Sequence, residues 1–234
     1  MKPFCYIAAA LLLFEICGCR PRPDVAAPPA TVPGLLDARK GFSTTLREKV
    51  QSGKTAEDPP PAVFNLVKYP SDSGNLAAYV GVPPKDGGRH PALIWLVGGF
   101  SNGISPIAWT PGPRDNDQSA AAFREAGIIM MYPSLRGGND NPGTMESFYG
   151  EVNDVIAAAN YLAKLDYVDP RRIYLGGHST GGTLALLVAE STDQFRATFS
   201  FGPVEDVRGY GQEHLLFDIK NAREAALRAP EKWL

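Results

Sequence analysis

Apolar residues between positions 62 and 234 fall into two alternating patterns, short continuous runs and longer runs at helical spacing. The short runs are rich in β-branched and aromatic residues, which favours strands. The longer runs repeat every three or four residues, which predicts amphipathic helices. The expected strands are 63–67, 76–80, 92–97, 128–132, 172–175 and 197–201, and the expected helices are 120–126, 145–165, 183–190 and 217–229. Strands that alternate with helices predict a mainly parallel sheet with helices on both faces.

The first 19 residues have the pattern of an export signal. Lys2 precedes an almost wholly apolar run, residues 4–14, which is too short to span a bilayer but suits the core of a signal peptide. Ile16-Cys17-Gly18-Cys19 then resembles a bacterial lipobox, in which cleavage leaves a lipidated cysteine at the new amino terminus. We therefore expect a signal peptide over residues 1–19 and a lipid anchor on Cys19 that holds the protein to a membrane surface, facing the periplasm or the cell exterior. The alternative is an ordinary signal peptide cleaved near Gly18.

The chain between this signal and residue 62 has little to bury. Residues 20–33 are rich in proline and alanine, which is typical of an extended tether. A short helix is expected within 35–50, and three consecutive prolines at 59–61 close the segment. The sequence therefore predicts a tether and linker over 20–61 and one folded domain over 62–234.

Composition narrows the class of protein. The 234 residues carry a net charge of −2, which provides no basic field for nucleic acid. All three cysteines lie within the first 19 residues, so no disulfide is expected in the folded region. No Cys/His spacing typical of a metal site is present, and neither a metal nor a cofactor is expected. The sequence does not indicate the oligomeric state.

The motif with the clearest chemistry is Gly177-His178-Ser179-Thr180-Gly181. It reads as G-x-S-x-G between a short strand and a helix, the arrangement of a nucleophile elbow. Such a turn lifts a serine hydroxyl above a sheet, and its glycines allow close backbone approach. Ser179 is therefore the expected nucleophile. The backbone N–H of Thr180 is expected to face the oxygen on which negative charge develops.

Several stretches resemble the catalytic domain of the prolyl oligopeptidase family and its dienelactone-hydrolase-like relatives. Residues 97–100, Val-Gly-Gly-Phe, stand where that family has His-Gly-Gly-Pro, and residues 135–138, Leu-Arg-Gly-Gly, look like its Tyr-Arg-Gly-Ser loop. Glu151 and Asp154 match an acidic pair on the helix before the elbow strand, and 169–173 matches Asp-Pro-x-Arg-Ile. The resemblance covers about residues 92–202 and implies the α/β-hydrolase fold. It also implies that Gly99 supplies the second N–H for the developing oxyanion.

The resemblance further implies a catalytic acid and a histidine that follow two more strands. After residue 217 the sequence reads as a helix and then the lead-in to a strand, so we expect an incomplete α/β-hydrolase sheet that lacks the last two strands. Such a chain would be truncated and its triad would lack the acid and the histidine.

The histidines within the chain offer one alternative. In this fold the order is serine, acid, histidine, and Asp206 with His214 satisfies that order within one short loop. The other interpretation places Asp206 in a turn and His214 on the surface or over the mouth of the site. His178 adjoins the nucleophile and is expected to point away from it, and His90 is expected in a loop.

The sequence thus predicts a serine hydrolase that cleaves a peptide or ester bond through an acyl-enzyme on Ser179. Val97 replaces the family's histidine, and Thr180 replaces the tyrosine that follows the serine in the peptidases. These departures weigh against peptidase activity more than against hydrolysis. The alternatives are a carboxylesterase and a catalytically dead hydrolase retained as a binding module or as a pseudogene product.

Overall fold

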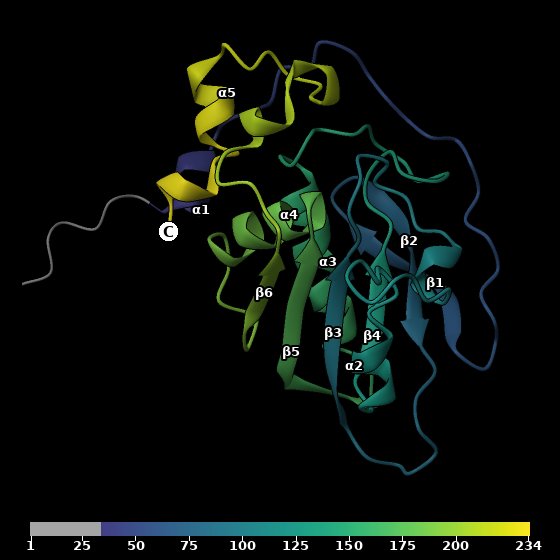
Figure 1. Ribbon diagram of the computed structural model, residues 1–234. Coiled ribbons are helices and arrows are strands. Elements are labelled where there is room, and N and C mark those ends of the chain that lie inside the picture. The colour runs from purple at the N-terminus through teal and green to yellow at the C-terminus, as the bar shows by residue number, and fades with distance from the viewer. Residues whose placement is uncertain (1–33) are drawn as a thin grey trace, which may run out of the picture. The chain divides into compact units, whose positions relative to one another are not determined.

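The computed structural model describes residues 34–234, which belong to one compact unit, and the predicted signal peptide and lipid anchor lie outside the described residues. Six strands form one sheet in the order β1-β2-β4-β3-β5-β6 (Figure 1). Strands β3 to β6 run parallel to one another, whereas β1 and β2 pair in antiparallel fashion and β2 joins β4. The strands are β1 Phe64–Ser71, β2 Gly74–Gly81, β3 His90–Leu96, β4 Ile129–Pro133, β5 Val168–His178 and β6 Thr198–Phe201. This mixed, mostly parallel sheet confirms the predicted fold class.

Alternate residues of the central strands enter two separate cores. On one face, Ala92, Ile94 and Leu96 of β3 pack under α3 (Glu151–Leu162) and α4 (Thr180–Ala189). On the other face, Leu93 and Trp95 pack with residues beside α2 (Ala121–Glu125). Because side chains of a strand alternate between faces, the continuous apolar run of β3 supplies both cores.

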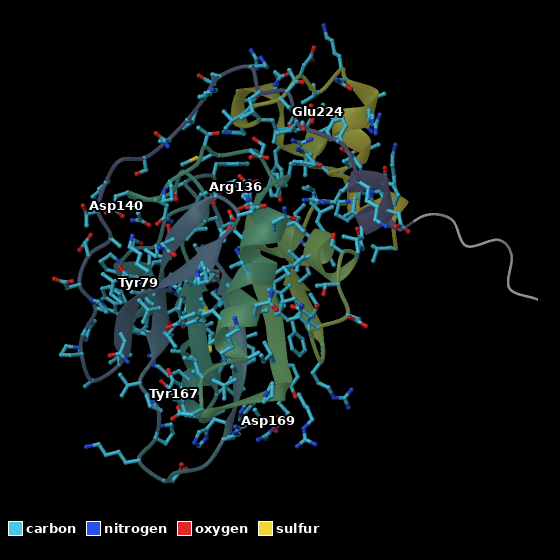
Figure 2. The ribbon with its side chains drawn as sticks, turned by 180° about the vertical axis from the view of Figure 1, so that it is seen from behind. Tyr79, Arg136, Asp140, Tyr167, Asp169 and Glu224 are labelled. Atoms are coloured by element: carbon cyan, nitrogen blue, oxygen red, sulfur yellow. The ribbon has the colours of Figure 1, made fainter. Side chains whose placement is uncertain are left out.

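Polar side chains mark the two ends of the sheet (Figure 2). Asp169 stands near the start of β5, whereas Arg136 follows the end of β4 and lies at the opposite end of the sheet. The carboxyl ends of the parallel strands therefore gather on the Arg136 side, where open α/β sheets bind their ligands.

Residues 20–61 are predicted to be a tether and linker, and the structure describes the part of this range from residue 34 onward. Residues 34–61 pack on the sheet domain. Leu35 of α1 (Leu35–Arg39) is fully buried in the main core. Leu46 forms an isolated antiparallel bridge with Phe217, so this segment runs beside the C-terminal part of the chain (Figure 1). The compact unit accordingly begins before the predicted boundary at residue 62.

A buried ion pair joins the same two segments. Arg228 and Glu224 are both nearly inaccessible and form an ion pair at 2.5 Å between Nη1 and Oε2. Glu224 also accepts from the Thr44 hydroxyl at 2.9 Å and from the Thr45 N–H at 2.6 Å. These hydrogen bonds hold α5 (Ala222–Ala226), and they satisfy a carboxylate that would otherwise be costly to bury.

Two predicted helices are shorter than expected. The helix predicted over 145–165 begins only at Glu151, because Ser147 and Phe148 have positive φ angles and the Ser147 hydroxyl accepts from the Leu216 N–H at 2.9 Å. The helix predicted over 217–229 is the five-residue α5, which starts after Asn221 caps it. A tertiary hydrogen bond takes the place of helical ones before α3, and a side-chain cap sets the start of α5.

Strand β6 is an edge strand within the described residues, since it pairs only with β5. Phe199 and Phe201 are 40% and 47% exposed. The two further strands that the resemblance implied are not among residues 34–234. None of the described helices is long and apolar enough to cross a membrane.

Candidate active site

Ser179 sits at the turn between the end of β5 and the first residue of α4. Its backbone has φ 54° and ψ −120°, a conformation that is strained for any residue other than glycine. The Ser179 N–H donates to the Phe201 carbonyl at 2.8 Å, and its carbonyl accepts from the Thr183 N–H at 3.0 Å. The predicted strand–serine–helix arrangement is therefore present.

The glycines around Ser179 are required by close backbone contacts. A Cβ on Gly177 would lie against the backbone of Gly181, and a Cβ on Gly181 would lie against the Leu96 carbonyl. A Cβ on Gly98 would be 3.3 Å from the Ser179 Cβ. The elbow thus packs directly on the chain that leaves β3, and the backbone contacts at Gly177 and Gly181 leave no room for a larger residue.

The two predicted oxyanion donors come from these adjoining segments. Thr180 is the first residue of α4, so its N–H has no partner within the helix and lies at the positive end of the helix dipole. Gly99 has φ +104°, and its carbonyl accepts from the Thr180 hydroxyl at 2.7 Å. In the part of the chain that the structure describes, the N–H groups of Thr180 and Gly99 have no hydrogen-bond acceptor.

A cavity of about 240 Å³ adjoins both residues. Gly99 and Thr180 lie in its wall, and most of the remaining lining is apolar: Leu96, Val97, Phe100, Leu135, Phe148 and Leu184. Such a mainly apolar hollow with few polar groups is typical of a small-molecule site. The arrangement provides a serine, unpaired N–H donors, and a binding space that is lined by the donors Gly99 and Thr180 and borders the turn that carries Ser179.

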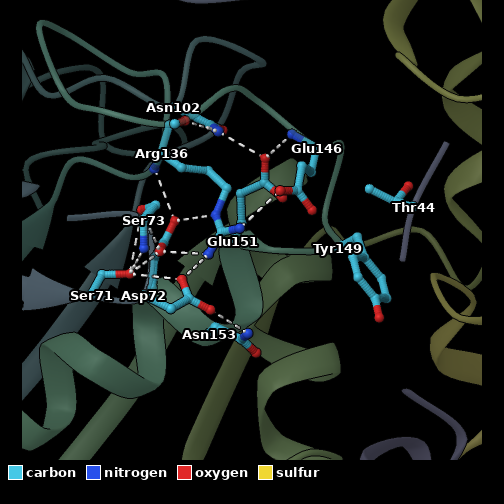
Figure 3. A network of polar contacts seen from close by, with 12 residues as sticks. Thr44, Ser71, Asp72, Ser73, Asn102, Arg136, Glu146, Tyr149, Glu151 and Asn153 are labelled. Atoms are coloured by element: carbon cyan, nitrogen blue, oxygen red, sulfur yellow. Dashed lines mark hydrogen bonds and ion pairs between the residues drawn. The ribbon is translucent and has the colours of Figure 1, made fainter. Parts of the chain in front are cut away.

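A polar network holds the loops at this edge of the sheet (Figure 3). Arg136 donates to Asp154 from its backbone N–H and from its guanidinium, and it also pairs with Glu146 at 2.9 Å. Glu151 accepts from the Asn102 amide at 2.9 Å and from the Glu146 N–H at 2.6 Å. The acidic pair of α3 therefore anchors the loops after β3 and β4.

Burial sets the electrostatics of this network. Burial raises the pKa of Glu151, which is only 2% exposed. Burial alone would lower the pKa of Arg136, but its hydrogen bonds and charge interactions with Asp154 and Glu146 raise it above its ordinary value. Arg136 thus remains charged and compensates the carboxylates around it.

The structure separates the candidate acid and the candidate base. Asp206 accepts from the N–H and the guanidinium of Arg208, and the guanidinium contact is 2.5 Å. Burial alone would raise the pKa of Asp206, but its bonds with Arg208 lower it below its ordinary value. His214 lines the cavity and stacks on Phe100 with a centroid distance of 4.7 Å. Among residues 34–234, no hydrogen bond joins Asp206 to His214, and none joins any imidazole to the Ser179 hydroxyl.

The other two histidines have separate partners. His178 Nδ1 lies 2.7 Å from the Gln118 amide nitrogen, and His90 lies 3.1 Å from Asp86. Gln118 contacts the loop after β3, and Asn102 lies in that loop and donates to the Arg136 carbonyl and to Glu151; sequence reasoning missed both. Neither stands in a recognisable motif, and their partners are distant in the sequence, so no local signal marked them.

Comparison with known proteins agrees with this fold. The family model described as "Prolyl oligopeptidase family" matches residues 114–228. A prolyl endopeptidase of Elizabethkingia meningoseptica is 29% identical over 147 residues, which are 58% of this chain and 20% of that protein. Prolyl oligopeptidase A of Galerina marginata is 28% identical over 103 residues, which are 42% of this chain and 13% of that protein.

Solved structures show the same architecture. A puromycin-hydrolyzing peptidase of Mycobacterium tuberculosis superimposes with a TM-score of 0.58 and 21% identity over 76% of this chain and 31% of its own. Dipeptidyl peptidase 4 of Porphyromonas gingivalis gives a TM-score of 0.55 and 20% identity over 73% of this chain and 25% of its own. The chain spans about 20% of the length of the first prolyl endopeptidase above. Residues 114–228 of this chain thus match the prolyl oligopeptidase family, and its sheet domain has the fold of the α/β-hydrolase peptidases.

Proposed function

We propose that this chain carries a serine acyl-transfer site in which Ser179 becomes acylated by a peptide or ester substrate. The observation that carries the proposal is the strained Ser179 backbone at the β5–α4 turn, beside the unpaired N–H groups of Thr180 and Gly99. A strained conformation persists only where the surrounding structure enforces it, and nucleophile elbows are such a place.

The chemistry follows from these groups. The Ser179 Oγ attacks the substrate carbonyl carbon, and a bond forms between them while the hydroxyl proton leaves to an acceptor. The carbonyl π electrons move to the oxygen, which the N–H groups of Thr180 and Gly99 stabilise. Collapse of this intermediate breaks the bond to the leaving alcohol or amine, which takes up a proton. Water then repeats the sequence and releases the acid and the free serine.

The rate depends on the proton acceptor. Within the described residues no imidazole is bonded to Ser179, so water is the acceptor in our proposal. Sites with binding and oxyanion groups but without a working triad keep roughly a thousandfold acceleration over water. We expect acylation of this chain to fall in that range.

The family implies peptide substrates, and the residues of this site favour small acyl groups. Val97 occupies the position of the family's histidine, and the cavity beside Gly99 and Thr180 holds only about 240 Å³. An ester also has a better leaving group than an amide and needs less help from a general acid. A carboxylesterase is therefore the variant of the proposal that the cavity favours.

A binding module without turnover is the second candidate. The observation that favours it is the separation of Asp206 and His214, since Asp206 is engaged by Arg208 and His214 stacks on Phe100. In that case the cavity would hold an apolar acyl compound and Ser179 would not react.

Two substrates and one variant distinguish these functions. The protein and Ser179→Ala are compared on p-nitrophenyl acetate and on a peptide p-nitroanilide with proline before the cleaved bond. Release of nitrophenol alone, dependent on Ser179, indicates a carboxylesterase, and release of nitroaniline as well indicates a peptidase. Saturable binding of p-nitrophenyl acetate without an acyl-enzyme supports the binding module. Equal ester hydrolysis by Ser179→Ala contradicts the proposal.

We also propose that Cys19 carries the lipid anchor of an exported lipoprotein, on the strength of the apolar run and the lipobox-like Ile16–Cys19 sequence. Expression in a bacterium with labelled palmitate should label the protein, and Cys19→Ala should abolish the label. Cys17→Ala is the matched control and should keep it. Equal labelling of Cys19→Ala would contradict the anchor.

A further inference from the structure

We infer that Gln118 is a positioning residue that holds the peptide carrying the Gly99 N–H in place by tying it to the elbow. This inference rests on the proposed acyl transfer at Ser179. Gln118 lies before α2 and is only 8% exposed. Its Oε1 accepts from the Gly98 N–H at 3.1 Å, and its Nε2 lies 2.7 Å from His178 Nδ1. One side chain therefore links the loop after β3 to the residue before Ser179.

These two bonds fix how each partner must be arranged. The Gly98 N–H can only donate, so the amide oxygen of Gln118 faces it and the amide nitrogen faces His178. The His178 Nδ1 must then accept, which places the imidazole proton on Nε2. The Gln118 amide nitrogen also donates to the side-chain oxygen Oδ1 of Asn116 at 2.7 Å, which supports the same orientation of the Gln118 amide. His178 is thus a member of this bridge and is not aimed at the serine as a base.

The peptide between Gly98 and Gly99 is held from both sides. Before it, the Gly98 N–H is fixed by Gln118. After it, the Gly99 carbonyl is fixed by the Thr180 hydroxyl at 2.7 Å. The direction of the Gly99 N–H follows from these two constraints, because a glycine pair is otherwise free to rotate. An oxyanion donor is effective only when it is oriented before the reaction, so loss of one constraint should lower the acylation rate.

The test uses Gln118→Leu, which removes the bonds to Gly98, His178 and Asn116 at similar volume, and Gln118→Glu, which keeps an acceptor for Gly98 but no donor for His178. Gln194→Leu is the matched control, because Gln194 is an exposed amide distant from the cavity. The acetylation rate of Ser179 by p-nitrophenyl acetate is followed by mass spectrometry. Hydrogen exchange of the Gly98 amide and the ¹⁵N signals of the His178 ring are measured on the same proteins.

We expect Gln118→Leu to acetylate about tenfold to a hundredfold more slowly, less than the loss of a whole oxyanion donor. The Gly98 amide should exchange faster and the His178 Nδ1 signal should shift. Gln118→Glu should keep Gly98 protected and lose the His178 signature, with an intermediate rate. Gln194→Leu should match the parent protein in all three measurements.

If hydrogen exchange of the Gly98 amide is unchanged in Gln118→Leu, the inference is overturned, whatever the acetylation rate of Ser179. An unchanged rate with altered exchange would overturn it as well, because the bridge would then have no bearing on the reaction. If the parent protein is not acetylated on Ser179 at all, the proposed function fails, and the positioning role fails with it even where exchange shows that the bridge exists. The three measurements therefore separate the two failures.

Discussion

Two segments beside the cavity differ in how their position is fixed. The first wall is the backbone of residues 98–103 and 177–181, and the second wall is residues 206–216, of which Glu213, His214 and Leu216 line the cavity. In the first wall, backbone packs on backbone, and a Cβ on Gly181 would strike the Leu96 carbonyl. In the second wall, two short helical turns follow one another, Val207 and Leu215 are buried, His214 is exposed, and Asp206 pairs with its neighbour Arg208. Close packing therefore fixes the backbone of the first wall, whereas short turns and side-chain hydrogen bonds, such as that from the Leu216 N–H to the Ser147 hydroxyl, hold the second wall.

This difference separates the two parts of a serine hydrolase mechanism. Nucleophile and oxyanion donors need fixed backbone, which close glycine packing provides. A general base must be a side chain that reaches the serine hydroxyl. His214 instead stacks on Phe100. In our proposal the molecule is thus preorganised for attack on a carbonyl, while no imidazole among its described residues is bonded to Ser179 to accelerate proton transfer.

The largest expected effect comes from a methyl group added to the first wall. Gly181→Ala should lower the free energy of unfolding by about 3 kcal/mol or more, because the new Cβ meets backbone that cannot move aside. The matched control is Gly202→Ala beyond β6, where φ is +57° and no atom lies within 4 Å of a new Cβ. That change should cost only about 1 kcal/mol, for the left-handed backbone. Urea unfolding measures both, and equal losses would contradict rigid packing at the elbow.

A smaller effect is expected at the other end of α4. The two carboxyl oxygens of Glu190 are buried without a partner among the described residues, and burial raises its pKa to about 8. The folded protein therefore keeps a proton that the unfolded chain releases, and stability falls as the pH rises from about 4.5 to about 8. Glu190→Gln should remove this slope and gain about 1 kcal/mol at pH 8, a value reduced because the residue is only partly buried.

Glu125→Gln, at an exposed position of α2, is the control for the loss of one negative charge. The Glu125→Gln variant should leave the dependence of stability on pH unchanged. Parallel pH profiles for Glu190→Gln and the parent protein would show that Glu190 ionises normally in the fold.

The smallest effects are expected in the second wall. Asp206→Asn and His214→Ala should each change the acetylation rate of Ser179 less than threefold, because neither residue is bonded to the serine. A loss of about a hundredfold or more in both variants would instead assign them as the acid and the base of a triad. The two walls would then act together when substrate is present.

The sequence allowed the sheet and the elbow to be predicted because both depend on local patterns. Continuous apolar runs indicated β3, β4 and β5, and G-x-S-x-G between a strand and a helix indicated Ser179. The roles of Ser179, Thr180 and Gly99 remain predictions.

Features set by distant contacts could not be predicted. The late start of α3 depends on a bond from Leu216 to Ser147, and the packing of residues 34–50 depends on Glu224 and Arg228. Gln118 reaches Gly98 and His178 across 20 and 60 positions of the chain. No periodicity in a single sequence encodes such pairs.

Formation of a covalent acyl-enzyme on Ser179 can be read from the mass of the protein after brief exposure to p-nitrophenyl acetate. We expect one added acetyl group, located on Ser179 by peptide mapping and absent in Ser179→Ala, whose thermal unfolding should match that of the parent protein. A folded protein that gains no acetyl group on Ser179, or gains the same label after Ser179→Ala, would rule out the proposed acyl transfer.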